Sequence, residues 1–209
     1  HMPRGVPEYY VVGTHERERK QCMKEQSMMI EDILSKDNLN RAYQQVIRNK
    51  GAAGVDGMGC EGLLSHLRAN GARIRESVRN QSYKPMPVKR VEIPKDDGSK
   101  RKLGIPTVTD RMIQQATAQV LTPIYERKFH KNSYGFRIGK SAQQAVLKAV
   151  EYMNEGYNWV VDIDLEKFFD TVNHDKLISI LNKEIKDGKT LSLIRKFLVS
   201  GVMVGERME

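Results

Sequence analysis

The chain has 209 residues, of which 39% are hydrophobic and 29% charged, and its formal net charge is +9. These values exclude a collagen-like or low-complexity chain, and the lack of any apolar run of about eighteen residues excludes a membrane-spanning helix. The two isolated cysteines, Cys22 and Cys60, argue against a disulfide framework or a structural zinc site and favour a cytoplasmic setting.

The positive charge is concentrated in residues 36–111, which hold sixteen Lys and Arg against eight Asp and Glu. A concentration of this kind favours a polyanionic partner, because each neutralised phosphate releases condensed counterions. A solvated basic surface would have the same composition, so the charge alone leaves both interpretations open.

The first strong element follows a lead-in of residues 1–35 that we expect to be partly ordered. Residues 35–50 have the apolar spacing of a helix, with Ser35 or Asp37 as its cap. The opposite, polar face carries Arg41, Gln44, Gln45 and Arg48. The four glycines of residues 51–59 predict a loop that ends this helix.

A second helix is expected over residues 61–81, weakened at Gly71, and the sequence period then changes from helical to two. Residues 89–93 and 100–105 flank a turn at 96–99, which predicts a hairpin. Pro94 and Pro106 limit the two strands and favour an edge position.

Two cations, Lys95 and Arg101, lie on either side of this turn. Folding of the hairpin can bring both over one anionic ligand, as in triphosphate sites where Arg supplies a fork and Lys a point charge. A basic hairpin that is simply solvated is the alternative interpretation.

The remaining elements mix helices and strands without a regular alternation, which predicts an α+β fold. A helix capped by Thr109 or Asp110 should end near Pro123, and Ser141 should cap another that runs to Met153. The inward face of that second helix should consist of Ala142, Ala145, Val146, Ala149 and Met153. Residues 159–165 read as a strand, followed by helices over 173–186 and 190–198 and a strand over 199–204.

The strand at 159–165 holds the clearest candidate for chemistry. A period of two places Asp162 and Asp164 on one face, and carboxylates on an apolar strand need a cation, hydrogen bonds or a water-filled cleft. Such oxygen ligands suit Mg²⁺ that is bound together with substrate phosphates. Two structural aspartates, or the Asp-x-Asp metal site of a glycosyltransferase, remain alternatives at this point.

The order of several motifs closely resembles the reverse transcriptases encoded by group II introns, also called maturases. The motifs are GAAGVDG at 51–57, IPKDDGSKRKLGIPT at 93–107, DR at 110–111, SYGFR at 133–137 and VDIDLEKFFD at 161–170. The resemblance runs from about residue 36 to the end of the chain. It implies a right-hand polymerase, with a helical N-terminal extension and fingers over residues 36–155 and the start of the palm over 156–209.

Carried over by position, the resemblance implies a role for five residues. Asp164 would be the first catalytic carboxylate and a ligand of Mg²⁺, and Leu165 would offer its backbone carbonyl to the same metal site. Phe169 would be the steric gate beneath the incoming sugar. Lys95 and Arg101 would contact the triphosphate of a dNTP. The role of Asp162 stays open.

The resemblance also implies nucleic-acid partners: intron RNA, an RNA template and a DNA primer. The helix at 38–50 would lie on the intron RNA, and the loop at 51–59 would close over the template strand. The residues implied in these contacts are Arg41, Gln45, Arg48, Lys50, Gly51, Ala52, Ala53 and Gly54.

The family's remaining catalytic carboxylates and its thumb would follow residue 209, so the resemblance implies an N-terminal fragment that cannot polymerise by itself. A bacterial cytoplasmic protein with no membrane partner is expected, and the oligomeric state stays open, a homodimer included. Two other functions fit the same residues: a non-catalytic RNA-binding splicing module, and the reverse transcriptase of another bacterial retroelement.

Overall fold

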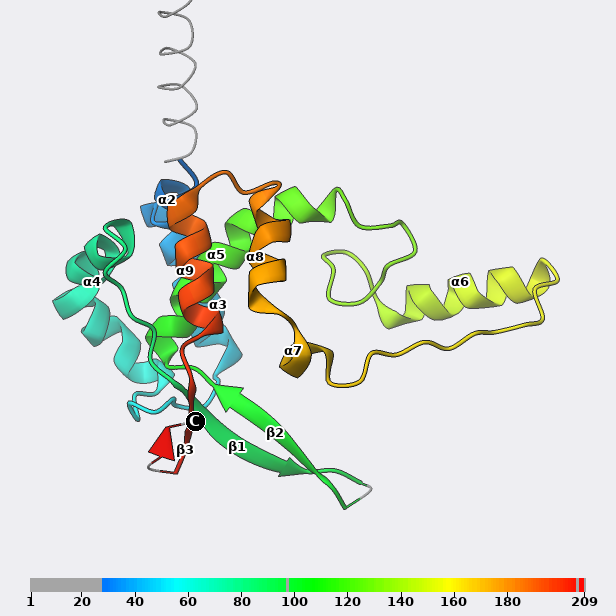
Figure 1. Ribbon diagram of the computed structural model, residues 1–209, viewed down its shortest axis with the longest axis horizontal. Coiled ribbons are helices and arrows are strands. Elements are labelled where there is room, and N and C mark those ends of the chain that lie inside the picture. The colour runs from blue at the N-terminus through cyan, green and yellow to red at the C-terminus, as the bar shows by residue number, and fades with distance from the viewer. Residues whose placement is uncertain (1–27, 97, 206, 209) are drawn as a thin grey trace, which may run out of the picture. The chain divides into compact units, whose positions relative to one another are not determined.

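The computed structural model describes residues 28–209 except 97, 206 and 209, and it divides into two compact units. The larger unit contains the described residues up to 119 together with 174–209, and the smaller contains residues 120–173. Figure 1 shows the helices and strands of both. Most of the expected lead-in, with Cys22, lies outside the described residues.

The larger unit begins with helices α2 (Met28–Ile33), α3 (Lys36–Asn49) and α4 (Leu63–Arg79), with a short 3₁₀ helix, η1 (Cys60–Gly62), before α4. The prediction of α3 is confirmed. The Ser35 hydroxyl accepts the Asn38 N–H at 3.4 Å, and Lys50 ends the helix in a left-handed conformation with φ 47°. These two caps satisfy backbone groups that a helix end leaves without partners.

The predicted hairpin is confirmed as strands β1 (Val88–Pro94) and β2 (Lys100–Ile105), which pair antiparallel and extend away from the helices of this unit (Figure 1). The sheet has the order β2-β1-β3-β4, completed by β3 (Val202–Val204) and β4 (Arg207–Met208). The predicted edge position holds for β2. It is wrong for the start of β1, because Val88 and Lys89 pair in parallel with β3.

Helix α5 (Val108–Glu126) supplies residues to both units and differs from its prediction at each end. Its cap is Thr107 rather than Thr109 or Asp110, because the Thr107 hydroxyl accepts the Asp110 N–H at 3.1 Å. The helix also continues through Pro123 to Glu126.

Two further helices, α8 (His174–Asn182) and α9 (Gly188–Leu198), confirm the pair predicted after residue 173. The mixture of helices with one mixed sheet confirms the α+β class. The buried hydrophobic side chains of the described residues all belong to the larger unit: Ile30, Ile33, Leu34, Ala42, Val46, Leu63, Val78, Val108, Met112, Ile113, Ala116, Ile185, Leu191 and Leu193.

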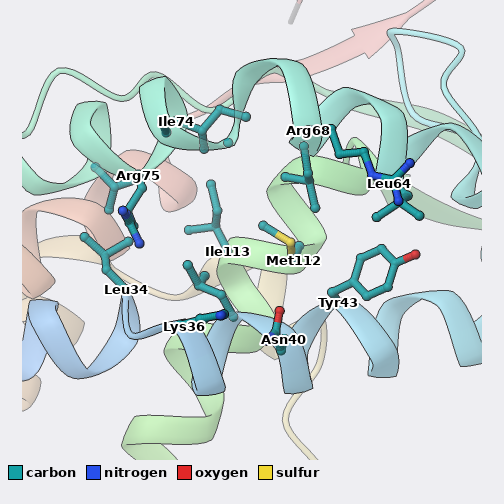
Figure 2. A pocket seen from close by; sticks show the side chains of 15 residues that line it. Leu34, Lys36, Asn40, Tyr43, Leu64, Arg68, Ile74, Arg75, Met112 and Ile113 are labelled. Atoms are coloured by element: carbon teal, nitrogen blue, oxygen red, sulfur yellow. The ribbon is translucent and has the colours of Figure 1, made fainter.

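An apolar groove of about 430 Å³ opens between α3, α4 and α5. Figure 2 shows Met112 and Ile113 of α5 between the side chains of α3 and α4. The charged side chains that line the groove are Lys36, Arg68 and Arg75, all cationic.

Gly71 lines this groove from the middle of α4, where an alanine should stabilise the fold. A Cβ at this position would lie 3.9 Å from the Leu67 Cβ, an ordinary van der Waals contact. We expect Gly71→Ala to raise the free energy of unfolding by about 0.5–1 kcal/mol, because alanine has fewer unfolded conformations to lose. Urea denaturation measures this, and a lower midpoint than wild type would contradict the expectation.

The smaller unit contains α6 (Ala142–Asn154) and α7 (Phe168–Thr171). The predicted cap of α6 is confirmed as a capping box between Ser141 and Gln144. Its predicted inward face is wrong, since no residue of α6 is buried and Val146 is 62% exposed.

The predicted strand at 159–165 is also wrong. These residues lie in the open stretch between α6 and α7 in Figure 1, without helix or strand structure. A strand needs a paired backbone, and the four described strands pair only with one another. As a result Val161 and Ile163 are 81% and 82% exposed.

Among the described residues no helix combines the length and the apolar character that crossing a membrane requires.

Candidate functional site

The hairpin brings the two predicted triphosphate ligands to one cavity. Lys95 and Arg101 both line a space of about 730 Å³, together with Ile93, Pro94, Asp96 and Leu103. The turn that places them is closed by a hydrogen bond from the Lys95 N–H to the Ser99 carbonyl at 2.8 Å. Gly98 takes φ +79°, which favours glycine there. The local backbone therefore brings the two cations to the same cavity.

The opposite face of the hairpin holds a separate ion pair. Lys100 Nζ lies 2.9 Å from Glu92 Oε2, and the hydrogen bond from Lys100 lowers the pKa of the Glu92 carboxyl. Because side chains alternate along β2, Lys100 points away from the face that carries Arg101. Strand β2 thus carries Lys100, paired with Glu92, on one face and Arg101, which lines the cavity, on the other.

The polar face of α3 carries three predicted RNA ligands, of which Arg41 and Arg48 are exposed and Gln45 is half-buried. The Arg41 guanidinium donates to Asn38 Oδ1 at 3.2 Å, and Arg48 donates to Gln45 Oε1. Both arginines are exposed and their bonds stay within the helix, so their charge faces solvent. Lys50 and the loop residues Gly51, Ala52 and Ala53 line an adjoining cavity of about 480 Å³, whereas Gly54 is buried.

The candidate catalytic residues lie in the smaller unit, within and just after the segment between α6 and α7 that has no helix or strand structure. Asp164 is exposed, and its Oδ1 accepts the N–H of Leu165 at 2.9 Å. Phe169 is 89% exposed and meets Phe168 edge to face, with 5.5 Å between ring centroids. In the larger unit the structure therefore places Lys95 and Arg101 at one cavity, and α3 beside the loop that follows it. Asp164 and Phe169 belong to the smaller unit.

The donors in this stretch fit a magnesium ion in kind. Asp162, Asp164 and the Leu165 carbonyl supply oxygen, and Mg²⁺ is commonly held by one or two carboxylates together with waters and substrate phosphates. No cluster of three or more His, Cys, Asp or Glu suited to a metal occurs in the part of the chain that the structure describes. Ligands from the substrate or from other residues would have to complete the coordination.

From the sequence, Asp110 is expected at most to cap a helix, and Arg111 has no predicted role beyond its place in a family motif. In the structure Asp110 is 1% exposed and its carboxylate accepts three hydrogen bonds. Arg111 donates to backbone carbonyls of residues 51–59, the glycine-rich loop. The pattern Thr107-x-x-Asp110 ahead of an apolar run is a capping signal that could have indicated the buried carboxylate. Nothing in the sequence indicated the long-range contacts.

Comparison with known proteins decides the family. The family described as reverse transcriptase (RNA-dependent DNA polymerase) matches residues 93–209, more than half of the chain. The chain belongs to this family. The matched range of this reverse transcriptase chain includes Lys95, Arg101, Asp164, Leu165 and Phe169, whereas α3 and the glycine-rich loop precede it.

The relatives confirm the resemblance to group II intron proteins. The group II intron-encoded protein LtrA of Lactococcus lactis is 38% identical over 178 residues, which cover 82% of this chain and 28% of LtrA. Protein YkfC of Escherichia coli K12 is 34% identical over 169 residues, which cover 78% of this chain and 44% of YkfC. This reverse transcriptase chain thus spans less than half of either relative.

A solved structure confirms the fold. A chain of the structure titled "Partial Cas6-RT-Cas1--Cas2 complex" aligns with a TM-score of 0.55 and 23% identity, covering 86% of this reverse transcriptase chain and 29% of that chain. The likeness supports a reverse transcriptase fold that extends beyond the matched range into the N-terminal helices.

Proposed function

We propose that the full-length protein that carries this chain is an RNA-directed DNA polymerase that also binds its intron RNA as a maturase. One observation carries the proposal. In a chain of the reverse transcriptase family, Lys95 and Arg101 line the same cavity. A fork and a point charge on one concave face suit the triphosphate of a dNTP. Primer extension on an RNA template, described in the Discussion, tests this function.

In the proposed reaction a primer 3′-OH attacks the α-phosphate of the dNTP and pyrophosphate leaves. Asp164 and the Leu165 carbonyl would hold Mg²⁺, and Mg²⁺ when bound stabilises the negative charge that develops on the phosphoryl oxygens. Lys95 and Arg101 would orient the triphosphate. Phe169 would lie beneath the sugar, where its ring excludes a 2′-OH.

The proposal divides the chain by role. Residues 36–155 would form the N-terminal extension and fingers, and residues 156–209 the start of the palm. The exposed apolar side chains at 159–165 support this assignment, because an exposed apolar segment marks a surface that another part of the full-length protein would cover. The 209 residues alone would be inactive, and a bacterial cytoplasm would be the setting.

The exposed arginines of α3 supply a direct test of RNA binding. We expect Arg41→Ala with Arg48→Ala to weaken binding of intron RNA and to lower the salt slope of log K by up to about 2, since each lost phosphate contact removes about one unit. Filter binding over a range of salt concentrations measures the slope. Arg73→Ala is the matched control, because this exposed arginine of α4 donates to Asn70 on its own helix and to no other residue that the structure describes. An unchanged slope in the double variant would contradict the assignment.

A further inference from the structure

A short segment at the start of α5 contacts two separate functional elements of the larger unit. The first contact is the buried carboxylate of Asp110. Its Oδ1 accepts the Tyr83 hydroxyl at 2.8 Å, and its Oδ2 accepts the Met86 N–H at 3.1 Å and the Thr107 hydroxyl at 2.7 Å. Burial and the neighbouring Asp110 raise the pKa of Tyr83, so its hydroxyl remains a donor.

Tyr83 and Met86 lie in the connection between α4 and β1, directly ahead of the hairpin. Asp110 thus holds the base of the hairpin through one side-chain and one backbone donor. A buried carboxylate with three donors is a rigid attachment, because the loss of one donor would leave part of its hydrogen-bonding capacity unsatisfied in the interior. The attachment fixes where β1 leaves the helical part of the unit.

The second contact is the glycine-rich loop. The next residue, Arg111, donates from Nη2 to the Ala52 carbonyl at 2.8 Å and lies 3.4 Å from the Gly51 carbonyl. The Gly54 backbone packs directly on the start of α5, since a Cβ there would lie 2.7 Å from both the N and the Cα of Thr107. A side chain at Gly51 would likewise meet the Arg111 guanidinium, at 2.2 Å from Nη1.

We infer that Asp110 and Arg111 are positioning residues that set the distance between the glycine-rich loop and the β1–β2 hairpin. They do so through adjacent positions on one helix, so neither element can shift independently of α5 without breaking charge-assisted bonds. The inference rests on the proposed function, in which the loop covers the template strand and the hairpin holds the dNTP. It assigns the Arg111 charge to the protein's own carbonyls rather than to nucleic acid.

The correct spacing would hold the template strand and the incoming nucleotide in their binding positions, so a loosened anchor should weaken binding to the element that it holds. We therefore expect the two residues to affect different steady-state parameters of the full-length protein. Arg111→Ala should raise the KM for template-primer, and Asp110→Asn should raise the KM for dNTP, each by about tenfold as for one lost charge-assisted bond. kcat should change much less.

Hydrogen–deuterium exchange of the full-length protein measures the anchoring without reference to activity. Arg111→Ala should speed exchange of amides in residues 51–57 by about tenfold and spare residues 82–88, because it removes the loop contacts alone. Asp110→Asn should give the reverse pattern. Arg73→Ala is the control and should leave both segments at the wild-type rate.

Two more variants separate anchoring from a general loss of folding. Gly54→Ala should displace the loop while leaving the Arg111 side chain unchanged. The double variant with Arg111→Ala should show little more exchange than either single variant, because both changes release the same loop from α5. Arg111→Lys, which keeps one point donor, should restore part of the protection of residues 51–57.

Unchanged exchange in residues 51–57 in both Arg111→Ala and Gly54→Ala would overturn the inference. If wild type makes no DNA while the exchange patterns appear as described, the proposed function fails and the anchoring stands.

Discussion

Replacement of Asp164 by alanine is expected to abolish DNA synthesis by the full-length protein, with a loss of at least about 10³-fold in rate. The reason is that Asp164 would be a ligand of the metal that stabilises the reacting phosphate. The affinity for RNA should stay near the wild-type value, because the Asp164 side chain is exposed and, within the described part of the chain, accepts a hydrogen bond only from the amide of Leu165. Primer extension and RNA binding, measured on the same preparation, check both parts.

The matched control is Asp162→Ala, which removes the same charge two residues away in the same open stretch. Activity retained in this variant would place the metal ligand at Asp164 alone. Loss confined to Asp162→Ala would move the ligand to Asp162, and full activity in both variants would remove this segment from the chemistry.

The second large effect is expected at Phe169. Phe169→Val should lower the discrimination between dNTP and rNTP by about a hundredfold, the order by which an apolar pocket rejects one added hydroxyl, because a smaller side chain leaves room for the 2′-OH. The ratio of kcat/KM for dGTP to that for GTP measures the discrimination. Phe169 is available for such a contact, since 89% of it is exposed.

Phe168→Val is the control for this change. Phe168 packs edge to face against Phe169 and is 48% exposed, so its replacement changes the same aromatic pair while leaving the proposed gate in place. Discrimination that falls equally in both variants would contradict the assignment of Phe169 and would point to a general loosening of α7.

The elements that the sequence predicted correctly are those that local contacts determine. Ser35 caps α3 from one residue outside the helix, and the turn around Gly98 sets the hairpin register within a few residues. Lys95 and Arg101 could therefore be placed together from the sequence, because only five residues, which contain one turn, lie between them.

Apart from the two ends of α5, the failures involve contacts between distant segments. The strand at 159–165 has strand-like composition, but composition supplies no pairing partner, and no described strand pairs with it. The predicted inward face of α6 failed for the same reason. Amphipathic spacing identifies an apolar face, but it does not supply the partner that would bury that face.

The roles of Asp110 and Arg111 could not be predicted because their partners lie far away in the chain. Tyr83 is 27 residues from Asp110, and Ala52 is 59 residues from Arg111. The sequence showed a cap at the start of α5 and a glycine-rich loop as separate features. In the folded chain the Arg111 side chain joins the start of α5 to the glycine-rich loop.

The most direct test of the central claim is extension of a DNA primer on an RNA template by the full-length protein, with dNTPs and Mg²⁺, alongside RNA binding by the same sample. We predict RNA-templated synthesis that requires Mg²⁺ and stops when Asp164 is replaced. Tight RNA binding without any extension would contradict the polymerase assignment and would make a non-catalytic splicing role the better account.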